Sequence, residues 1–288
     1  MGRVSSPTAG MCSVTYRPLS ADRIVELAAA AGLDRVEWGQ DAHVPLGDEA
    51  EARRVAEATR AAGLEVSALG SYYRVGVVAD AEEDRRMWRQ VLDAARALGA
   101  PRIRVWAGNT GSADVGAAGR RRIVDGLKRC VDSAAETTTD GGTGGTGGTG
   151  GGTGITVATE FHADTLTDEI VSARSMLDDV PGLRTYWQPP NGMPDEEALS
   201  GLRAVLDRVD GVHVFSWWPT SRERWPLEHR EALWRGALAT VAATGREIDA
   251  SIEFVPGDDP AVLPREAATL RRYLLGASGT ANGTIPPA

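Results

Sequence analysis

A glycine followed by a short strand-like stretch recurs along most of the chain. An amphipathic run with helical spacing precedes most of these glycines. Before Gly32, for instance, Ile24, Leu27 and Ala28 fall on one helical face. Glycine just past a helix readily adopts the left-handed conformation that ends the helix. The chain is therefore a series of strand, loop, helix and glycine units, whose glycine-led strands lie within residues 31–39, 62–70, 98–108, 153–162, 181–189, 210–218 and 244–254.

This repeat predicts an α/β fold, a single-domain (β/α)8 TIM barrel. An initial strand at residues 11–17 raises the number of strand–helix units to eight, in the roughly 250 residues that are typical of such a barrel. Alternating strands and helices imply parallel strands with right-handed crossovers. An open doubly wound sheet is the alternative, but it normally carries a glycine-rich phosphate loop after its first strand. The segment TYRPLSADR at that place contains no glycine, which favours the barrel.

The barrel domain is predicted to span residues 11–276, between a flexible N-terminus (1–10) and a flexible C-terminal tail (277–288). A Gly/Thr-rich run, DGGTGGTGGTGGGT, interrupts it and is interpreted as a disordered insertion over residues 139–153. The run lies between a predicted helix and the fifth strand. It therefore belongs to the bottom of the barrel, opposite the face that carries active sites in this fold. We expect it to take no part in the chemistry.

Charge and cysteine content narrow the class of protein. The net charge is −9 over 288 residues and only two cysteines occur, so a basic nucleic-acid surface and a disulfide framework are both unexpected. The N-terminus MGRVSSPTAG lacks the apolar core of a signal peptide, and no apolar run is long enough to span a membrane. We expect a cytoplasmic protein that binds a small molecule and neither nucleic acid nor membrane, with a homo-oligomer left open. Lys128, the only lysine, lies in a helical run, which argues against Schiff-base chemistry.

Charged groups stand at the ends of three predicted strands. Glu160, His213 and Glu253 each lie in a mostly apolar strand, where an unpaired charge would be costly. Strand ends converge on one mouth in a barrel, so these side chains should lie close together. A shared divalent cation would compensate both carboxylates and accept the imidazole as a neutral ligand. Mixed oxygen and nitrogen ligation suits Mn²⁺, Mg²⁺, Co²⁺ or Zn²⁺.

Aromatic side chains at the same strand ends suit a sugar or sugar-derived ligand. A flat indole packs against the apolar C–H face of a sugar ring while the hydroxyls bond elsewhere. An arginine in a top loop can bind a carboxylate or phosphate. The predicted substrate-binding residues are Glu37, Trp38, His43, Tyr72, Trp106, Asn109, His162, Trp187, Trp217 and Arg222.

Several of these motifs together resemble the xylose isomerase-like (β/α)8 superfamily, in its sugar phosphate isomerase/epimerase branch. The resemblance rests on VEWGQDAHVP, TEFH, YWQPP, VHVFSW and IEFV and covers residues 11–276. It implies four ligands to one divalent metal, which are Glu160, Gln188, His213 and Glu253. Gln188 stands where the family usually has aspartate. An amide oxygen coordinates a hard cation without contributing charge, so we expect weaker metal binding.

The resemblance also implies an activity, that of a metal-dependent sugar isomerase or epimerase on a ketose or keto-sugar derivative. Glu160 and Glu253 would be the catalytic groups, moving a proton through a cis-enediolate. A keto-inositol-type dehydratase or lyase would use the same chemistry on the same scaffold. A non-catalytic sugar-binding barrel is a further alternative, suggested by Gln188. An abasic-site endonuclease is disfavoured by the negative charge and by the presence of only four histidines.

Overall fold

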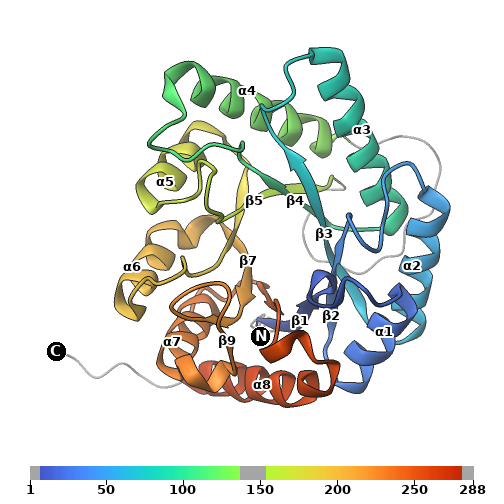
Figure 1. The fold of residues 1–288 in the computed structure, drawn as a ribbon, viewed down its shortest axis with the longest axis vertical. Coiled ribbons are helices and arrows are strands. Elements are labelled where there is room, and N and C mark those ends of the chain that lie inside the picture. The colour runs from blue at the N-terminus through green and yellow to red at the C-terminus, as the bar shows by residue number, and fades with distance from the viewer. Residues whose placement is uncertain (1–6, 137–153, 281–288) are drawn as a thin grey trace.

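A computed structural model of the chain describes residues 7–136 and 154–280. Within these residues, eight parallel strands close into a barrel with helices around its outside (Figure 1). The strands are β1 (Thr8–Cys12), β2 (Arg35–Gly39), β3 (Glu65–Arg74), β4 (Arg102–Trp106), β5 (Thr156–Glu160), β6 (Arg184–Trp187), β7 (Val209–Val214) and β10 (Asp249–Ile252). Their order around the barrel is β1-β10-β7-β6-β5-β4-β3-β2. The predicted (β/α)8 barrel is confirmed.

The α-helices of the described residues follow the strands in turn. They are α1 (Ala21–Ala30), α2 (Glu49–Ala61), α3 (Ala81–Leu98), α4 (Gly116–Ala135), α5 (Ile170–Asp179), α6 (Asp195–Val205), α7 (Glu231–Ala242) and α8 (Leu263–Thr280). A small antiparallel pair, β8 (Ser216–Trp217) with β9 (Arg224–Trp225), follows β7. Among these helices, none is both long and apolar enough to cross a membrane.

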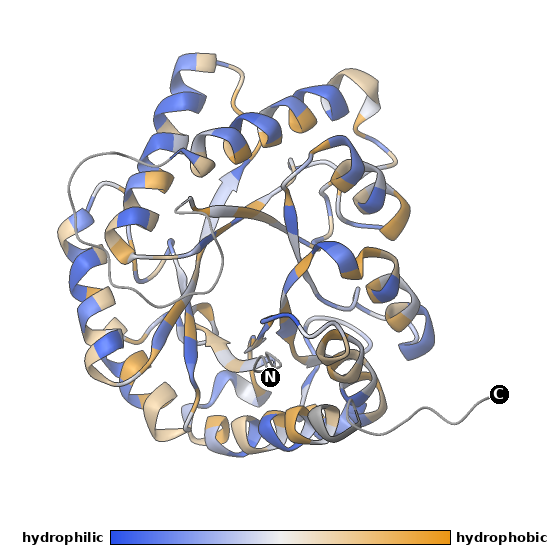
Figure 2. Cartoon of the chain, turned by 180° about the vertical axis from the view of Figure 1, so that it is seen from behind, coloured by the Kyte–Doolittle hydropathy of each residue, from blue (hydrophilic) through white to orange (hydrophobic). Residues whose placement is uncertain are grey.

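Helix α3 illustrates how the local sequence sets an element. The Asp80 side chain accepts hydrogen bonds from the backbone N–H groups of Glu82 and Glu83 and so begins the helix. Gly99, with φ of 70°, ends it. Val91 and Leu92 are buried against the barrel. Hydrophobic and hydrophilic residues alternate around the other helices as well (Figure 2), as expected for helices with one face on the barrel and one in solvent.

The first strand lies earlier than predicted. We expected a strand at residues 11–17, but β1 covers Thr8–Cys12 and a 3₁₀ helix, Ser13–Tyr16, follows it. Residues 8–10, expected in a flexible N-terminus, pair with β10 and β2. The Ser13 hydroxyl accepts a hydrogen bond from the Gly39 N–H and contacts Nδ1 of His43. These two contacts hold the chain in a turn directly after β1.

The predicted C-terminal end of the barrel and the predicted insertion can be compared with the residues that the structure describes. Helix α8 ends at Thr280, past the predicted barrel limit at residue 276. The Gly/Thr-rich insertion predicted over residues 139–153 lies outside the described residues, as does 281–288 of the predicted tail.

Two polar layers occupy the barrel interior, with a packed layer between them. At the amino end of the strands, Asp249 pairs with Arg35 and Arg102. Above them, the Tyr186 ring fills the space beside Gly211, where any side chain would collide with the ring. The second polar layer lies at the carboxyl end of the strands and contains the candidate site.

Candidate active site

His213 of β7 lies at the centre of the polar groups at the barrel mouth and is fully buried. Its Nε2 is 3.1 Å from Oε2 of Glu37, and its Nδ1 is 3.0 Å from Oε1 of Gln188. The Gln188 amide is oriented by its own donation to the Phe161 carbonyl, at 2.7 Å. Burial alone would lower the pKa of His213, but the neighbouring Cys12, Glu37 and Glu253 raise it well above its ordinary value.

The three residues that the sequence singled out as a metal site lie together. Oε1 of Glu160, at the end of β5, is 3.5 Å from His213 Nδ1. Oε2 of Glu253, just after β10, is 3.7 Å from the same nitrogen. One ligand atom from each of the three residues falls within 4.8 Å of the others. Gln188 reaches the same nitrogen, so all four predicted ligands surround one small volume.

Arg104 of β4 is a site residue that the sequence analysis missed. Its side chain is buried between two carboxylates, donating from Nε to Oε1 of Glu37 at 2.7 Å and from Nη1 to Oε2 of Glu160. A sequence signal was available, because Arg104 interrupts an apolar strand just as the glutamates do. The strand RIRVW carries a second arginine, Arg102, which points to the other end of the barrel.

The buried carboxylates differ in their protonation. Burial would raise the pKa of Glu37, but Arg104 and His213 hold it at about 2. Burial would also raise the pKa of Glu160, but the same two cations, Arg104 and His213, lower it. At Glu253 burial prevails over the pull of His213, and the charge of Glu160 adds to it, so its pKa is raised. Two ionised carboxylates and one that holds a proton more readily thus share the site.

A cavity of about 660 Å³ opens next to Gln188, and neither His213 nor the three carboxylates are among the residues that line it. Among the predicted site residues, Gln188, His162 and Trp217 line it, together with Arg224. The indole Nε1 of Trp217 is buried and has no hydrogen-bond partner. A polar group of a ligand in the cavity could accept this bond, since buried donors are normally satisfied.

Aromatic rings gather on the β3–β5 side of the mouth. The His162 and Trp106 rings stack with centroids 4.3 Å apart, and the Tyr72 ring lies 5.4 Å from Trp106. Nε1 of Trp106 donates to Oε2 of Glu160 at 2.8 Å. The guanidinium of Arg74 lies over the same indole, 3.8 Å from its centroid.

The structure places the remaining predicted substrate-binding residues elsewhere. Trp38 and Trp187 are fully buried in the hydrophobic core. His43 is buried with both ring nitrogens engaged, Nδ1 by the Ser13 hydroxyl and Nε2 by the Leu19 carbonyl. Asn109 and Arg222 are exposed in loops after β4 and β8.

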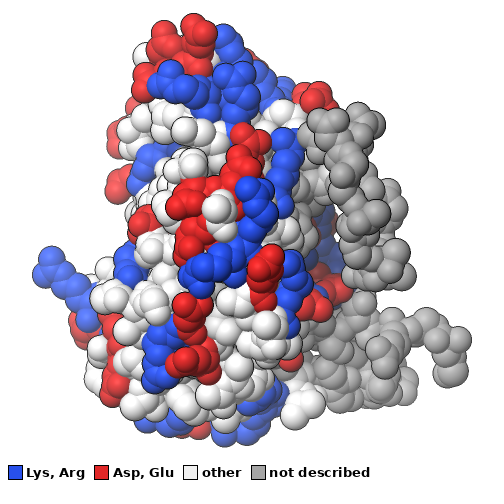
Figure 3. Space-filling model, turned by 90° about the vertical axis from the view of Figure 1, so that its right-hand side faces the viewer, with Lys and Arg blue, Asp and Glu red and all other residues white. Residues whose placement is uncertain are grey.

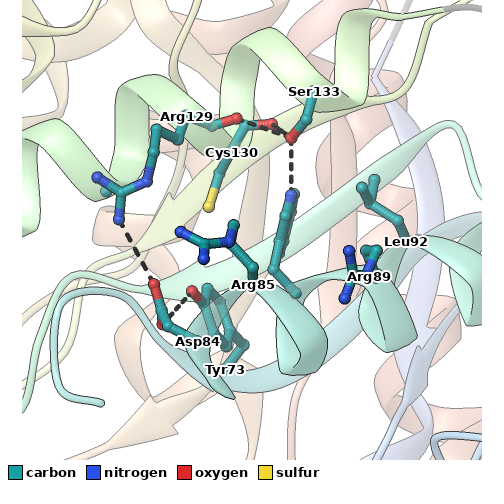
Figure 4. Close-up of a pocket in the computed structure, with 10 residues that line it drawn as sticks. Tyr73, Asp84, Arg85, Arg89, Leu92, Arg129, Cys130 and Ser133 are labelled. Atoms are coloured by element: carbon teal, nitrogen blue, oxygen red, sulfur yellow. Dashed lines mark hydrogen bonds and ion pairs between the residues drawn. The ribbon is translucent and has the colours of Figure 1, made fainter. Parts of the chain in front are cut away.

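A second cavity, of about 260 Å³, lies between α3 and α4 (Figure 4). Three of its polar side chains bond to one another: the Tyr73 hydroxyl donates to Asp84 at 2.6 Å, and Asp84 also pairs with Arg129. Burial raises the pKa of the Cys130 thiol, which makes it a poor nucleophile. Chemistry is therefore better placed at the barrel mouth.

A closed parallel barrel whose reactive side chains gather at the carboxyl ends of its strands defines a TIM-barrel protein with an enzyme-like site. The model of one family, described as xylose isomerase-like TIM barrel, matches residues 25–273. The chain belongs to this family, which confirms the resemblance noted in the sequence.

Solved structures share the fold at low sequence identity. The probable 3-DHS dehydratase AsbF of Bacillus anthracis is 17% identical with a TM-score of 0.69, over 92% of this chain and 98% of that one. The IolI protein with a bound zinc atom is 13% identical with a TM-score of 0.66, over 96% and 100%. The 3-keto-D-glucoside 4-epimerase YcjR of E. coli is 17% identical with a TM-score of 0.64, over 92% and 99%. No curated protein matches the sequence.

Proposed function

We propose that the chain is a divalent-metal-dependent isomerase or epimerase of a ketose or keto-sugar derivative. It would transfer a proton through a cis-enediolate. The observation that carries the proposal is the surrounding of His213 Nδ1, which faces the oxygens of Glu160, Gln188 and Glu253 at 3.5, 3.0 and 3.7 Å.

The donor set fits a divalent ion. Metal-binding histidines usually donate their second ring N–H to a carboxylate, and Nε2 of His213 faces Glu37 in that way. Two carboxylates, an amide oxygen and an imidazole suit Mn²⁺, Mg²⁺, Co²⁺ or Zn²⁺. Glu160, Gln188, His213 and Glu253 would hold the ion. The neutral amide of Gln188 supports a weaker site than an aspartate would.

The two glutamates, Glu160 and Glu253, would transfer the proton. A divalent ion in this site would act as a Lewis acid on a substrate carbonyl and so acidify the neighbouring C–H. Glu160 ends β5 and Glu253 directly follows β10, and β6 and β7 separate these two strands in the barrel. They therefore approach the mouth from different directions. One can remove a proton and the other can return it to another atom or face.

The cavity suits a small polyhydroxylated substrate. Its volume, about 660 Å³, is within the range of roughly 300–1,000 Å³ that is usual for small-molecule sites. Trp217 offers an apolar ring face, and His162, which also lines the cavity, stacks on Trp106. On the face shown in Figure 3, acidic and basic side chains are interspersed, without the broad basic surface that a nuclease needs.

A dehydratase of a keto-sugar or keto-inositol is the second candidate. It is supported by the fold that the chain shares with the probable 3-DHS dehydratase AsbF, and by the presence of a second carboxyl, Glu253, near Glu160, because a carboxyl that carries a proton can assist a leaving hydroxyl. Both candidates share the first step, removal of the acidified proton.

Solvent exchange tests that step. The Mn²⁺-loaded protein is incubated in D₂O with a panel of ketoses, keto-inositols and keto-sugar acids, and deuterium in each compound is followed by NMR. We expect exchange into at least one compound, and a loss of about 100-fold or more in Glu160→Gln and Glu253→Gln. Glu223→Gln, an exposed residue in the loop before β9, is the matched control. Loss of water from the substrate would favour the dehydratase; no exchange with any compound would contradict both candidates.

A further inference from the structure

We propose that Arg104 is a positioning residue that aligns two metal ligands at once. It holds Glu160 directly and His213 through Glu37. This inference rests on the proposed metal site and goes beyond it, because Arg104 is outside the proposed set of ligands and donates to Glu37 and Glu160.

The barrel interior has space for the Arg104 side chain next to a glycine of β3. The Arg104 side chain is only 3% exposed, between Glu37 of β2 and Glu160 of β5. On β3, which lies between β2 and β4, residue 70 is a glycine. A Cβ there would lie 2.7 Å from Nη2 of Arg104 and 2.7 Å from Oε1 of Glu37. The missing side chain leaves the space that the ion pair occupies.

The two carboxylate oxygens of Glu160 have different neighbours. Oε2 accepts hydrogen bonds from Arg104 and from Nε1 of Trp106. Oε1 is the oxygen nearer to His213 Nδ1, at 3.5 Å. Carboxylates can bind a cation through one oxygen or both. With Oε2 engaged by two donors, Glu160 offers one oxygen, and that oxygen is aimed at the site.

The second link runs through Glu37. Its Oε1 accepts from Nε of Arg104 at 2.7 Å, and its Oε2 lies 3.1 Å from Nε2 of His213. Glu37 cannot rotate without losing one of these contacts. The imidazole is thereby held with Nδ1 toward the other ligands. Such outer partners commonly change metal affinity about 10–100-fold when mutated.

The guanidinium matters for its shape as well as its charge. Its planar fork donates from Nε and Nη1 in two fixed directions, toward two carboxylates on different strands. A lysine at this position keeps the positive charge but has no fork. Arg104→Lys therefore separates alignment from simple charge compensation.

The experiment measures metal binding rather than turnover. Wild type, Arg104→Lys and Trp106→Phe are titrated with Mn²⁺ by EPR, and each is loaded with Co²⁺ for its visible spectrum, which reports coordination. We expect Arg104→Lys to bind Mn²⁺ about 10–100-fold more weakly, with an altered Co²⁺ spectrum. Trp106→Phe removes one of the two donors to Oε2 and should change both readouts in the same direction, by less.

Arg102→Lys is the matched control. Arg102 lies on the same strand, is largely buried and pairs with buried Asp249, but at the opposite end of the barrel. Its replacement should leave both metal readouts at wild-type values.

Three outcomes would overturn the inference. The first is a folded Arg104→Lys with wild-type Mn²⁺ affinity and Co²⁺ spectrum. If Arg104→Lys does not fold, Trp106→Phe and Glu37→Gln are measured in its place. The second outcome is then a wild-type Mn²⁺ affinity and Co²⁺ spectrum in both of these variants. The third is an equal effect of Arg102→Lys. A wild-type protein that binds neither ion would instead refute the proposed metal site, a result distinguishable from the other three.

Discussion

Buried ionisable residues at the barrel mouth form a chain of contacts, from Glu160 through Arg104 and Glu37 to His213. Glu160 and His213, at the two ends of this series of contacts, are predictable from the sequence because their charges interrupt apolar strands. Glu37 was predicted to bind substrate, and Arg104 was not predicted. The alternation of a strand shows which side chains point inward, but pairing partners on strands far apart in sequence depend on barrel register.

Gly70 should tolerate no side chain beside the Arg104–Glu37 pair. A Cβ at this position meets atoms of both residues at 2.7 Å. We expect Gly70→Ala to destabilise the protein by about 1–3 kcal/mol through overpacking, and to weaken Mn²⁺ binding. Urea unfolding and Mn²⁺ titration measure the two effects. Gly201→Ala in α6, where the nearest atom is 3.8 Å away, is the control and should be neutral or stabilising. Equal stability of the two variants would contradict the close contact.

His43 should make stability depend on pH. Burial lowers its pKa below the ordinary 6.5, although the hydrogen bond to the Leu19 carbonyl opposes this. The folded state thus favours the neutral ring. Its stabilising contribution is complete above pH 6.5, the ordinary pKa that the ring has in the unfolded chain. That contribution is lost as the pH falls through the lowered pKa, because the unfolded chain then binds a proton that the folded protein resists.

Urea midpoints at pH 8 and pH 5.5 test this. Wild type should lose more stability between the two than His43→Gln does. His229→Gln, at an exposed histidine, should behave like wild type. The same pH dependence in wild type and His43→Gln would refute the prediction.

At the scale of elements, the glycine-led periodicity predicted seven of the strands within a few residues, because each follows an amphipathic helix. The first strand was misplaced for a physical reason. Thr8–Cys12 contains small residues with little β preference, whereas Val14, Thr15 and Tyr16 favour strands but form a 3₁₀ turn. Tertiary contacts of Ser13 override that local preference.

The connection between α4 and β5 should tolerate shortening. The N–H of Ile155 donates to the Ala134 carbonyl at 2.8 Å, so the two elements meet closely where the connection leaves and returns. Deleting residues 141–152 should change the free energy of unfolding by about 1 kcal/mol or less, by loop-closure scaling. Mn²⁺ affinity should not change, because Glu160 lies at the other end of β5. A folded deletion variant that has lost the metal would mean that the segment reaches the site.

At the scale of the whole molecule, the polar layers at the two ends of the barrel have different roles. The Arg35, Arg102 and Asp249 group closes the amino end of the strands with compensated charges. The carboxyl end carries the cavity and the donor set. Tyr186 and its small neighbours Ala68 and Ala158 separate the layers. Changes in one layer should therefore leave the other intact.

Metal should stabilise the whole fold by mass action. An ion that binds only the folded state at about 100 times its Kd adds about 2.7 kcal/mol. We expect the Tm of the wild type to rise with Mn²⁺ and the Tm of Glu253→Gln to rise less. Arg102→Lys, altered only in the lower layer, should respond like wild type. An equal rise in Glu253→Gln would place the stabilising ion elsewhere.

The most direct test of the proposed metal site is an anomalous difference map from crystals soaked in Mn²⁺. We predict one strong peak at the barrel mouth, among Glu160, Gln188, His213 and Glu253, with Oε2 of Glu160 still bonded to Arg104. Crystals of Glu253→Gln soaked in the same way should show a weaker peak. No peak among these four residues, or a peak only at another place on the molecule, would contradict the metal site and the proton transfer that depends on it.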